Sequence, residues 1–121
     1  MFDHIGIAAT DLAASQAFYL AALEPIGVSL LMRDGSAIGL GQGSKPSFWV
    51  GVDGAQVAPM HLAFRAENRA QVQEFHRKAL AAGGRDNGPP GLRPEYHANY
   101  YAAFVIGPDG HNLEVVCHRP E

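Results

Sequence analysis

The sequence is poor in cysteine, in charge of one sign and in long hydrophobic runs. Cys117 is the one cysteine in 121 residues, which excludes an intrachain disulfide and a cysteine-built zinc site and is typical of a reducing compartment. Nine Lys and Arg against twelve Asp and Glu give a net charge of -3, so there is no basic excess for nucleic acid. No apolar run approaches the roughly 20 residues of a membrane helix, and Asp3 and His4 interrupt any signal-peptide pattern. We expect a cytoplasmic protein without nucleic-acid or membrane partners.

What the sequence does contain is an internal repeat. An offset of 57 residues, without gaps, gives eight identities between residues 4–27 and the second half of the chain. The identical pairs are His4/His61, Ala9/Ala66, Ala13/Ala70, Gln16/Gln73, Phe18/Phe75, Ala22/Ala79, Leu23/Leu80 and Gly27/Gly84. We predict two modules, about residues 1–57 and 58–121. Each is too short to bury its own apolar face, so both belong to one domain spanning residues 1–121.

Both modules have the same order of predicted elements: a strand, a helix and then two or three strands. The first strands span residues 2–9 and 60–66, where apolar residues alternate with others. Thr10 or Asp11 in the first module and Asn68 in the second are suitable N-caps for the helices that follow. The later strands are predicted at residues 26–32, 37–40, 48–52, 100–106 and 113–118.

Two histidines occupy matching positions in the repeat. Side chains alternate across a strand, so His4 and Gly6 share one face while Ile5 and Ile7 face the helix. In the second module His61 and Ala63 share the equivalent face. A rough two-fold relation between the modules would bring the two imidazoles towards each other, with small neighbours leaving room beside them.

The last strand of each module adds two more positions to this set. Glu114 lies within an apolar strand, where a carboxylate is strongly disfavoured unless it is paired or binds a metal. Its counterpart in the first module is Trp49, which cannot bind a metal. Two histidines and one carboxylate form the ligand set of open catalytic metal sites and of non-haem Fe(II) oxygenases. The simpler alternative is that His4 and His61 are partly exposed strand histidines and Glu114 is an edge carboxylate.

The motifs around these residues resemble those of the vicinal oxygen chelate superfamily, which includes glyoxalase I, bleomycin-resistance proteins and extradiol dioxygenases. The resemblance covers essentially the whole chain and implies an α+β fold. In that fold, tandem βαβββ modules form curled mixed sheets around a metal, with the helices packed outside. By this resemblance His4, His61 and Glu114 are the metal ligands. The motifs that carry it are Asp3-His4-Ile-Gly-Ile, Phe18-Tyr19, Met60-His61-Leu-Ala-Phe and Pro108-Asp-Gly-His-Asn-Leu-Glu114.

The branches of the superfamily resemble this chain to different degrees. Glyoxalase I enzymes have a carboxylate ligand at the position of Trp49, whereas extradiol dioxygenases use two histidines and one glutamate. His97 resembles the histidine that begins the dioxygenase signature, but Val105 and Gly107 replace its tyrosine and its acid. Bleomycin-resistance proteins bind their drug without the triad. The ligand set therefore favours dioxygenase chemistry among the named reactions.

Several other residues are candidates for contact with a substrate. Residues 86–99 are rich in proline and glycine and are predicted to form a connecting or binding loop. Within it, Arg93 suits an anionic substrate group and His97 suits a general acid or base. Tyr100 and Tyr101 fall on opposite faces of their strand, so only one of them can face the cavity. We take Tyr101, with His97, as a catalytic candidate and Tyr100, with Arg93 and Trp49, as a substrate contact.

The remaining histidines are expected to be structural or exposed. His76 lies on the apolar stripe of the second helix and is predicted to pack there. His111 lies in the turn around Pro108-Asp109-Gly110 and is predicted to be solvated.

These observations predict a metal-dependent enzyme in which a divalent ion chelates vicinal oxygens of a small-molecule substrate. The same donors accept Fe, Zn, Mn or Ni, and both dioxygenase and lyase or isomerase chemistry fit. The alternative is a non-catalytic protein that sequesters a small molecule or an antibiotic. Exposed strand edges predict a homodimer, and the metal site can lie within one chain or be shared across the dimer.

Overall fold

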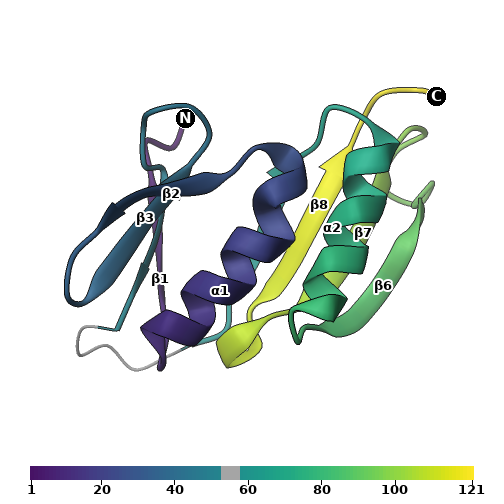
Figure 1. Ribbon diagram of the computed structural model, residues 1–121. Helices are drawn as coiled ribbons and strands as arrows, with labels where there is room; N and C mark the ends of the chain where they lie inside the picture. The colour runs from purple at the N-terminus through teal and green to yellow at the C-terminus, as the bar shows by residue number, and fades with distance from the viewer. Residues whose placement is uncertain (53–57) are drawn as a thin grey trace.

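The computed structural model describes residues 1–52 and 58–121, and its elements repeat in the two halves of the chain (Figure 1). The predicted module boundary at residue 57 lies outside the described residues. No helix of the described residues is long and apolar enough to span a membrane. In chain order the elements are β1 (Ile5–Ala8), α1 (Leu12–Leu23), η1 (Glu24–Ile26), β2 (Ser29–Arg33), β3 (Ala37–Gly41), β4 (Phe48–Gly51), β5 (His61–Arg65), α2 (Arg69–Ala81), β6 (Arg85–Leu92), β7 (Tyr101–Ile106), η2 (Pro108–Gly110) and β8 (Asn112–Cys117).

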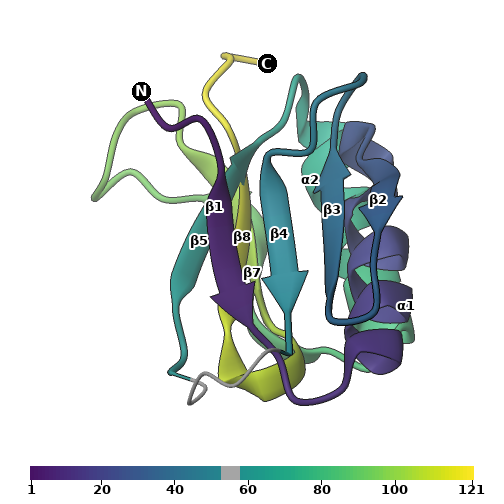
Figure 2. The same ribbon diagram turned by 90° about the vertical axis from the view of Figure 1, so that its left-hand side faces the viewer.

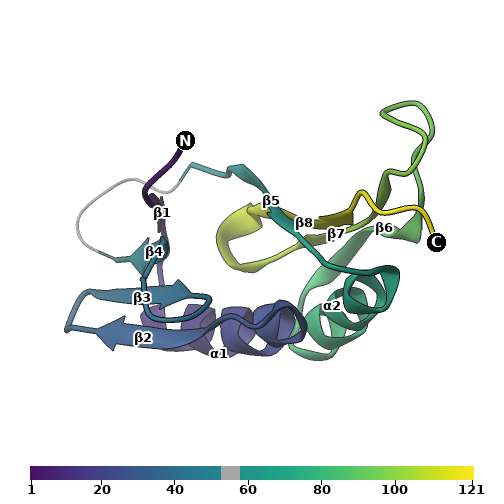
Figure 3. The same ribbon diagram turned by 90° about the horizontal axis from the view of Figure 1, so that it is seen from above.

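The strands form two mixed sheets of four, one from each half of the chain. The strand orders are β1-β4-β3-β2 and β5-β8-β7-β6, so the fourth strand of each half lies beside the first. In both sheets that pair is parallel and the other pairs are antiparallel. Figure 2 shows the first sheet face-on, and Figure 3 shows α2 along one face of the second sheet. This confirms the predicted α+β fold of repeated βαβββ units, although within the described residues neither sheet closes on itself.

The helices begin at the N-caps that the sequence indicates. The side chain of Asp11 caps α1 by accepting from the Ala14 N–H, and Asn68 caps α2 by accepting from the Gln71 N–H. Gly27, with φ of 83°, and Gly83, with φ of 104°, take left-handed conformations that only glycine adopts at little cost. Gly27 follows η1 and Gly83 follows the end of α2, so a left-handed glycine ends each helical segment.

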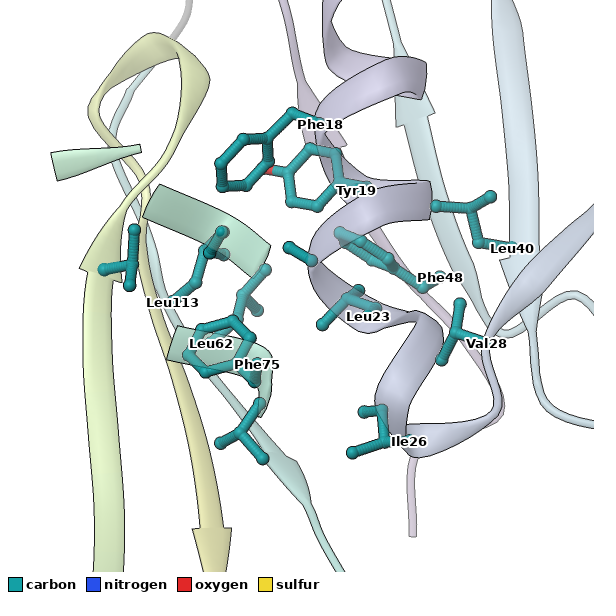
Figure 4. Close-up of a cluster of buried hydrophobic side chains, with 14 of the residues drawn as sticks. Phe18, Tyr19, Leu23, Ile26, Val28, Leu40, Phe48, Leu62, Phe75 and Leu113 are labelled. Carbon is teal, nitrogen blue, oxygen red and sulfur yellow. The ribbon is translucent and has the colours of Figure 1, made fainter. Parts of the chain in front are cut away.

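The core is continuous between the two halves of the chain (Figure 4). α1 packs against α2, and residues from both helices and both sheets belong to one buried cluster. A run of edge-to-face aromatic contacts leads from α1 through β4 to β5, with ring centroids 5.2 Å apart for Tyr19–Phe48 and 5.4 Å apart for Phe48–Phe64. The shared core holds the two sheets together.

The segment predicted as a loop is partly a strand. β6 covers residues 85–92, including Pro89 and Pro90, and pairs with β7 at the edge of the second sheet. The register shifts between Asp86 and Gly88 and again between Gly88 and Gly91. Proline lacks the N–H that a central strand needs, but an irregular edge strand tolerates this loss. The predicted loop is therefore correct for residues 93–99, whereas residues 86–92 belong to the edge strand.

The prediction of a solvated His111 is wrong. Its side chain is 1% exposed, and its Nδ1 accepts from the Met60 N–H at 3.0 Å. Because Nδ1 is an acceptor, Nε2 carries the proton and donates to the Ala8 carbonyl oxygen at 2.9 Å. The ring is therefore a neutral link between the end of β1 and the start of β5. Turn residues are usually exposed, and contacts with segments distant in sequence, from both halves of the chain, bury this one.

Replacing His111 with alanine should lower the free energy of unfolding by about 1–3 kcal/mol, because two backbone groups lose their partner at a buried site. Urea unfolding followed by circular dichroism measures this. The exposed His118→Ala variant is the control and should change stability by less than about 0.5 kcal/mol. Equal stability of His111→Ala and the unsubstituted chain would show that the two hydrogen bonds of His111 contribute nothing to the free energy of unfolding.

Candidate functional site

The parallel pairing of β5 with β8 brings His61 and Glu114 together. Ala63 is the register partner of Glu114, and His61 lies two residues earlier on the same face of β5. Leu62 and Phe64, on the opposite face, contact the core. Both polar side chains therefore point away from α2, as the alternation in the sequence predicts.

Glu114 is a buried carboxylate with a partner at each oxygen. Its Oε1 lies 3.0 Å from His61 Nε2, and its Oε2 accepts a hydrogen bond from the Tyr100 hydroxyl. The side chain of Glu114 is 3% exposed, whereas that of His61 is 52% exposed. A carboxylate this buried is stable only with such partners. Its place in an apolar strand therefore indicates a paired or metal-binding role.

The environment of Tyr100 keeps its phenol protonated. Burial, the hydrogen bond to Glu114 and the negative charge of that carboxylate raise the pKa of Tyr100 to about 12. A phenol is protonated at neutral pH in any case, and the raised pKa extends its role as a donor to Glu114 to more alkaline pH.

A pocket of about 260 Å³ opens over this pair. The Phe104 ring, whose residue is the β7 register partner of Glu114, stacks beside the His61 imidazole with centroids 6.3 Å apart. The pocket is smaller than the roughly 300–1,000 Å³ of most ligand sites. Its lining residues are His61, Tyr96, Tyr100, Phe104, Asn112 and Glu114.

Three residues that line this pocket, Tyr96, Phe104 and Asn112, are missing from the candidates of the sequence analysis. The turn at Pro108–Gly110 would have allowed Phe104 and Asn112 to be predicted. Counting outward from it in an antiparallel hairpin places Phe104 opposite Glu114 and Ile106 opposite Asn112. A residue opposite a buried carboxylate lies on the same face of the sheet.

Trp49 occupies the equivalent position in the first sheet. It pairs with Gly6 of β1 and Gly39 of β3, as Glu114 pairs with Ala63 and Phe104. A Cβ atom at Gly39 would lie 2.9 Å from the Trp49 ring, so the indole lies directly against that glycine. The first sheet thus presents an aromatic surface at the position where the second presents a carboxylate.

His4 is not brought to the pair formed by His61 and Glu114. Its side chain is 59% exposed, and its Nδ1 contacts the Asp3 carboxylate at 2.7 Å. Among residues 1–52 and 58–121, no group of three or more His, Cys, Asp or Glu side chains is arranged to hold a metal. The single chain therefore presents two of the predicted ligands together and the third elsewhere.

The other candidate residues have different surroundings from those predicted. His97 is not among the pocket-lining residues, and its ring centroid lies 5.2 Å from His118 and 6.4 Å from Tyr100. Arg93 donates to the carbonyl oxygens of Pro89 and Gly91 and lies over the Phe104 ring, so it holds the edge of the second sheet.

Tyr101 lies on the helix side of its strand. Its hydroxyl accepts from Gln73 of α2, and the Arg69 guanidinium lies over its ring. The choice between the two tyrosines is thereby decided, because Tyr100 contacts Glu114 and Tyr101 does not face that pocket.

Many solved structures are similar to this fold. No protein-family model and no curated protein sequence matches the chain. A glyoxalase/bleomycin resistance protein from Albidiferax ferrireducens T118 is 27% identical, with 99% of each chain covered and a TM-score of 0.84. The chain belongs to the vicinal oxygen chelate superfamily.

Other members of the vicinal oxygen chelate superfamily share the fold at lower identity. A glyoxalase/bleomycin resistance protein/dioxygenase family enzyme from Burkholderia phytofirmans PsJN is 17% identical, over 97% of this chain and 98% of that one, with a TM-score of 0.75. A lactoylglutathione lyase from Agrobacterium tumefaciens is 19% identical, over 97% of this chain and 92% of that one, with a TM-score of 0.72. At these identities the likeness concerns the fold, and the activity depends on the site itself.

Proposed function

We propose that this protein is a metal-dependent enzyme that binds a divalent ion through His4, His61 and Glu114 and acts on a small substrate with two neighbouring oxygens. The observation that carries the proposal is the buried Glu114 carboxylate held 3.0 Å from the His61 imidazole. Imidazole and carboxylate donors suit Fe, Zn, Mn and Ni. The names of the similar structures, a lactoylglutathione lyase and a dioxygenase family enzyme among them, are consistent with small-molecule chemistry.

We propose that His4 reaches the site from a second copy of the chain. β1 and β5 are edge strands of their sheets, and both predicted histidines lie on or beside them. Phe2, 72% exposed, and Met60, 41% exposed, are large apolar side chains close in sequence to His4 and His61. Apolar side chains exposed beside half-formed sites fit burial against another copy. Sedimentation at micromolar concentration should show a dimer, and a monomer alone would contradict this arrangement.

The residues around the pair suit an oxygen-chelating site. A divalent ion held there would supply Lewis-acid polarisation of the two substrate oxygens. Phe104 provides an apolar wall beside His61, and Trp49 would provide a second wall from the first sheet of the other copy. His97, packed against Tyr100 and His118 near the protein surface, remains our candidate for moving a proton.

Metal analysis of protein purified without a histidine tag tests the proposal. We expect near-stoichiometric divalent metal in the unsubstituted chain and loss of that metal in Glu114→Gln, because the amide is a much poorer ligand of nearly the same shape. Glu67→Gln, at an exposed glutamate paired with Arg119, is the matched control and should keep its metal. Persistent absence of metal from the unsubstituted chain would contradict the enzyme proposal and favour a sequestering protein.

The preferred chemistry within this proposal is ring cleavage by dioxygen, because the ligand set is two histidines and one glutamate. Anaerobic loading with Fe(II), followed by air and a panel of catechols, should show substrate consumption that decreases in His97→Ala. A lack of consumption, with metal binding intact, would exclude the dioxygenase branch and leave lyase or isomerase chemistry.

A further inference from the structure

The two oxygens of Glu114 have different neighbours, and this difference has a consequence for metal binding. Oε1 lies 3.0 Å from His61 Nε2, while Oε2 accepts from the Tyr100 hydroxyl. Oε1 is therefore the oxygen that lies beside the His61 imidazole, and Oε2 is occupied by the Tyr100 hydroxyl.

The Tyr100 hydroxyl is held in place by packing. Its ring makes edge-on contacts with Tyr96 and His118, with centroids 5.0 Å and 5.2 Å away. Its backbone closes the turn that precedes β7. The Tyr100 carbonyl oxygen accepts from the Arg93 N–H, and the Tyr100 N–H donates to the His97 carbonyl oxygen. A phenol fixed in this way is ready to orient the carboxylate before any ion binds.

We infer that Tyr100 is a positioning residue that makes Glu114 a one-oxygen ligand. By holding Oε2, it turns Oε1 alone towards the ion beside His61 and keeps a coordination position open for substrate. This inference rests on the proposed function, since it assumes that Glu114 binds a metal. It gives Tyr100 a role different from the substrate contact predicted from the sequence.

Tyr100→Phe tests the inference because it removes one hydroxyl and keeps the ring. Titration calorimetry with Zn²⁺ should show affinity reduced by about 10–100-fold, the usual effect of losing a hydrogen-bond partner of a ligand. X-ray absorption at the zinc edge should show about one additional oxygen neighbour, because the released Oε2 can also bind. Tyr101→Phe, which loses only a bond to Gln73, is the matched control and should bind Zn²⁺ like the unsubstituted chain.

The outcomes separate this inference from the proposed function. If the unsubstituted chain binds neither Zn²⁺ nor Fe²⁺, Mn²⁺ or Ni²⁺ in the same titration, the proposed function is wrong. If it binds Zn²⁺ but Tyr100→Phe has unchanged affinity and an unchanged oxygen shell, the positioning role alone is wrong. A zinc shell that contains both Glu114 oxygens in the unsubstituted chain also contradicts that role, and this measurement does not depend on any variant.

Discussion

Mixing the variants His4→Ala and Glu114→Gln should restore a metal site that neither variant has alone. If His4 joins His61 and Glu114 from another copy, each variant by itself loses one ligand at every site. Each should then lose more than about 100-fold in affinity, the upper range for merely losing a partner of a ligand. In the mixed dimer, the His4→Ala chain contributes intact His61 and Glu114, and the other chain contributes intact His4.

The expected size of the effect follows from random assortment. With equal amounts and free exchange, half of the dimers are mixed and each contains one complete site, so the metal content recovers to about a quarter of the original. The matched control is a mixture of Glu114→Gln with His61→Ala, whose substitutions affect the same half of the site. That control mixture should bind no metal. Metal analysis after exchange measures both, and no recovery in the first mixture would show that the ligands are not shared between copies.

Phe75→Ala should have the largest effect on stability. Phe75 is 0% exposed on α2 and lies in the cluster shared by both halves of the chain (Figure 4). Removing a buried phenylalanine typically costs about 3–5 kcal/mol. A domain of this size has a free energy of unfolding of roughly 5–15 kcal/mol, so the variant should be close to unfolding.

Thermal and urea unfolding measure this effect. Leu80→Ala, on the same helix at a side chain 36% exposed, is the control and should cost much less. Equal costs for the two variants would show that the shared cluster is not the main source of stability. Because the core joins the two sheets, we also expect Phe75→Ala to lose them together in one transition.

Local sequence signals predicted the repeated elements well. The caps at Asp11 and Asn68 and the alternation around His61 depend on residues close in sequence, and the structure contains them as predicted. The repeat also placed Trp49 and Glu114 at equivalent positions of two sheets. Strand β6 was missed because proline and glycine are usually found outside strands, whereas an irregular edge strand accepts them.

Contacts between segments that are distant in sequence could not be predicted as well from the sequence. His111 is in a turn, and its burial depends on β1 and β5, which are far away in sequence. Alternation showed that only one of Tyr100 and Tyr101 could face the pocket, but the packing of Tyr101 against α2 decided which.

The sequence by itself determined that each half of the chain has a sheet with one face towards the core and one face away from it. His61 and Glu114 lie on the face away from the core. Alternation and repeat spacing suffice for this, because they depend only on backbone periodicity. Only the tertiary structure decided that Tyr100 holds Glu114 and that His4 lies apart from that pair. The physical reason is that the position of His4 depends on packing between α1 and α2, which places the two sheets, and that of Tyr100 on the fold of the loop before β7. No local pattern encodes either.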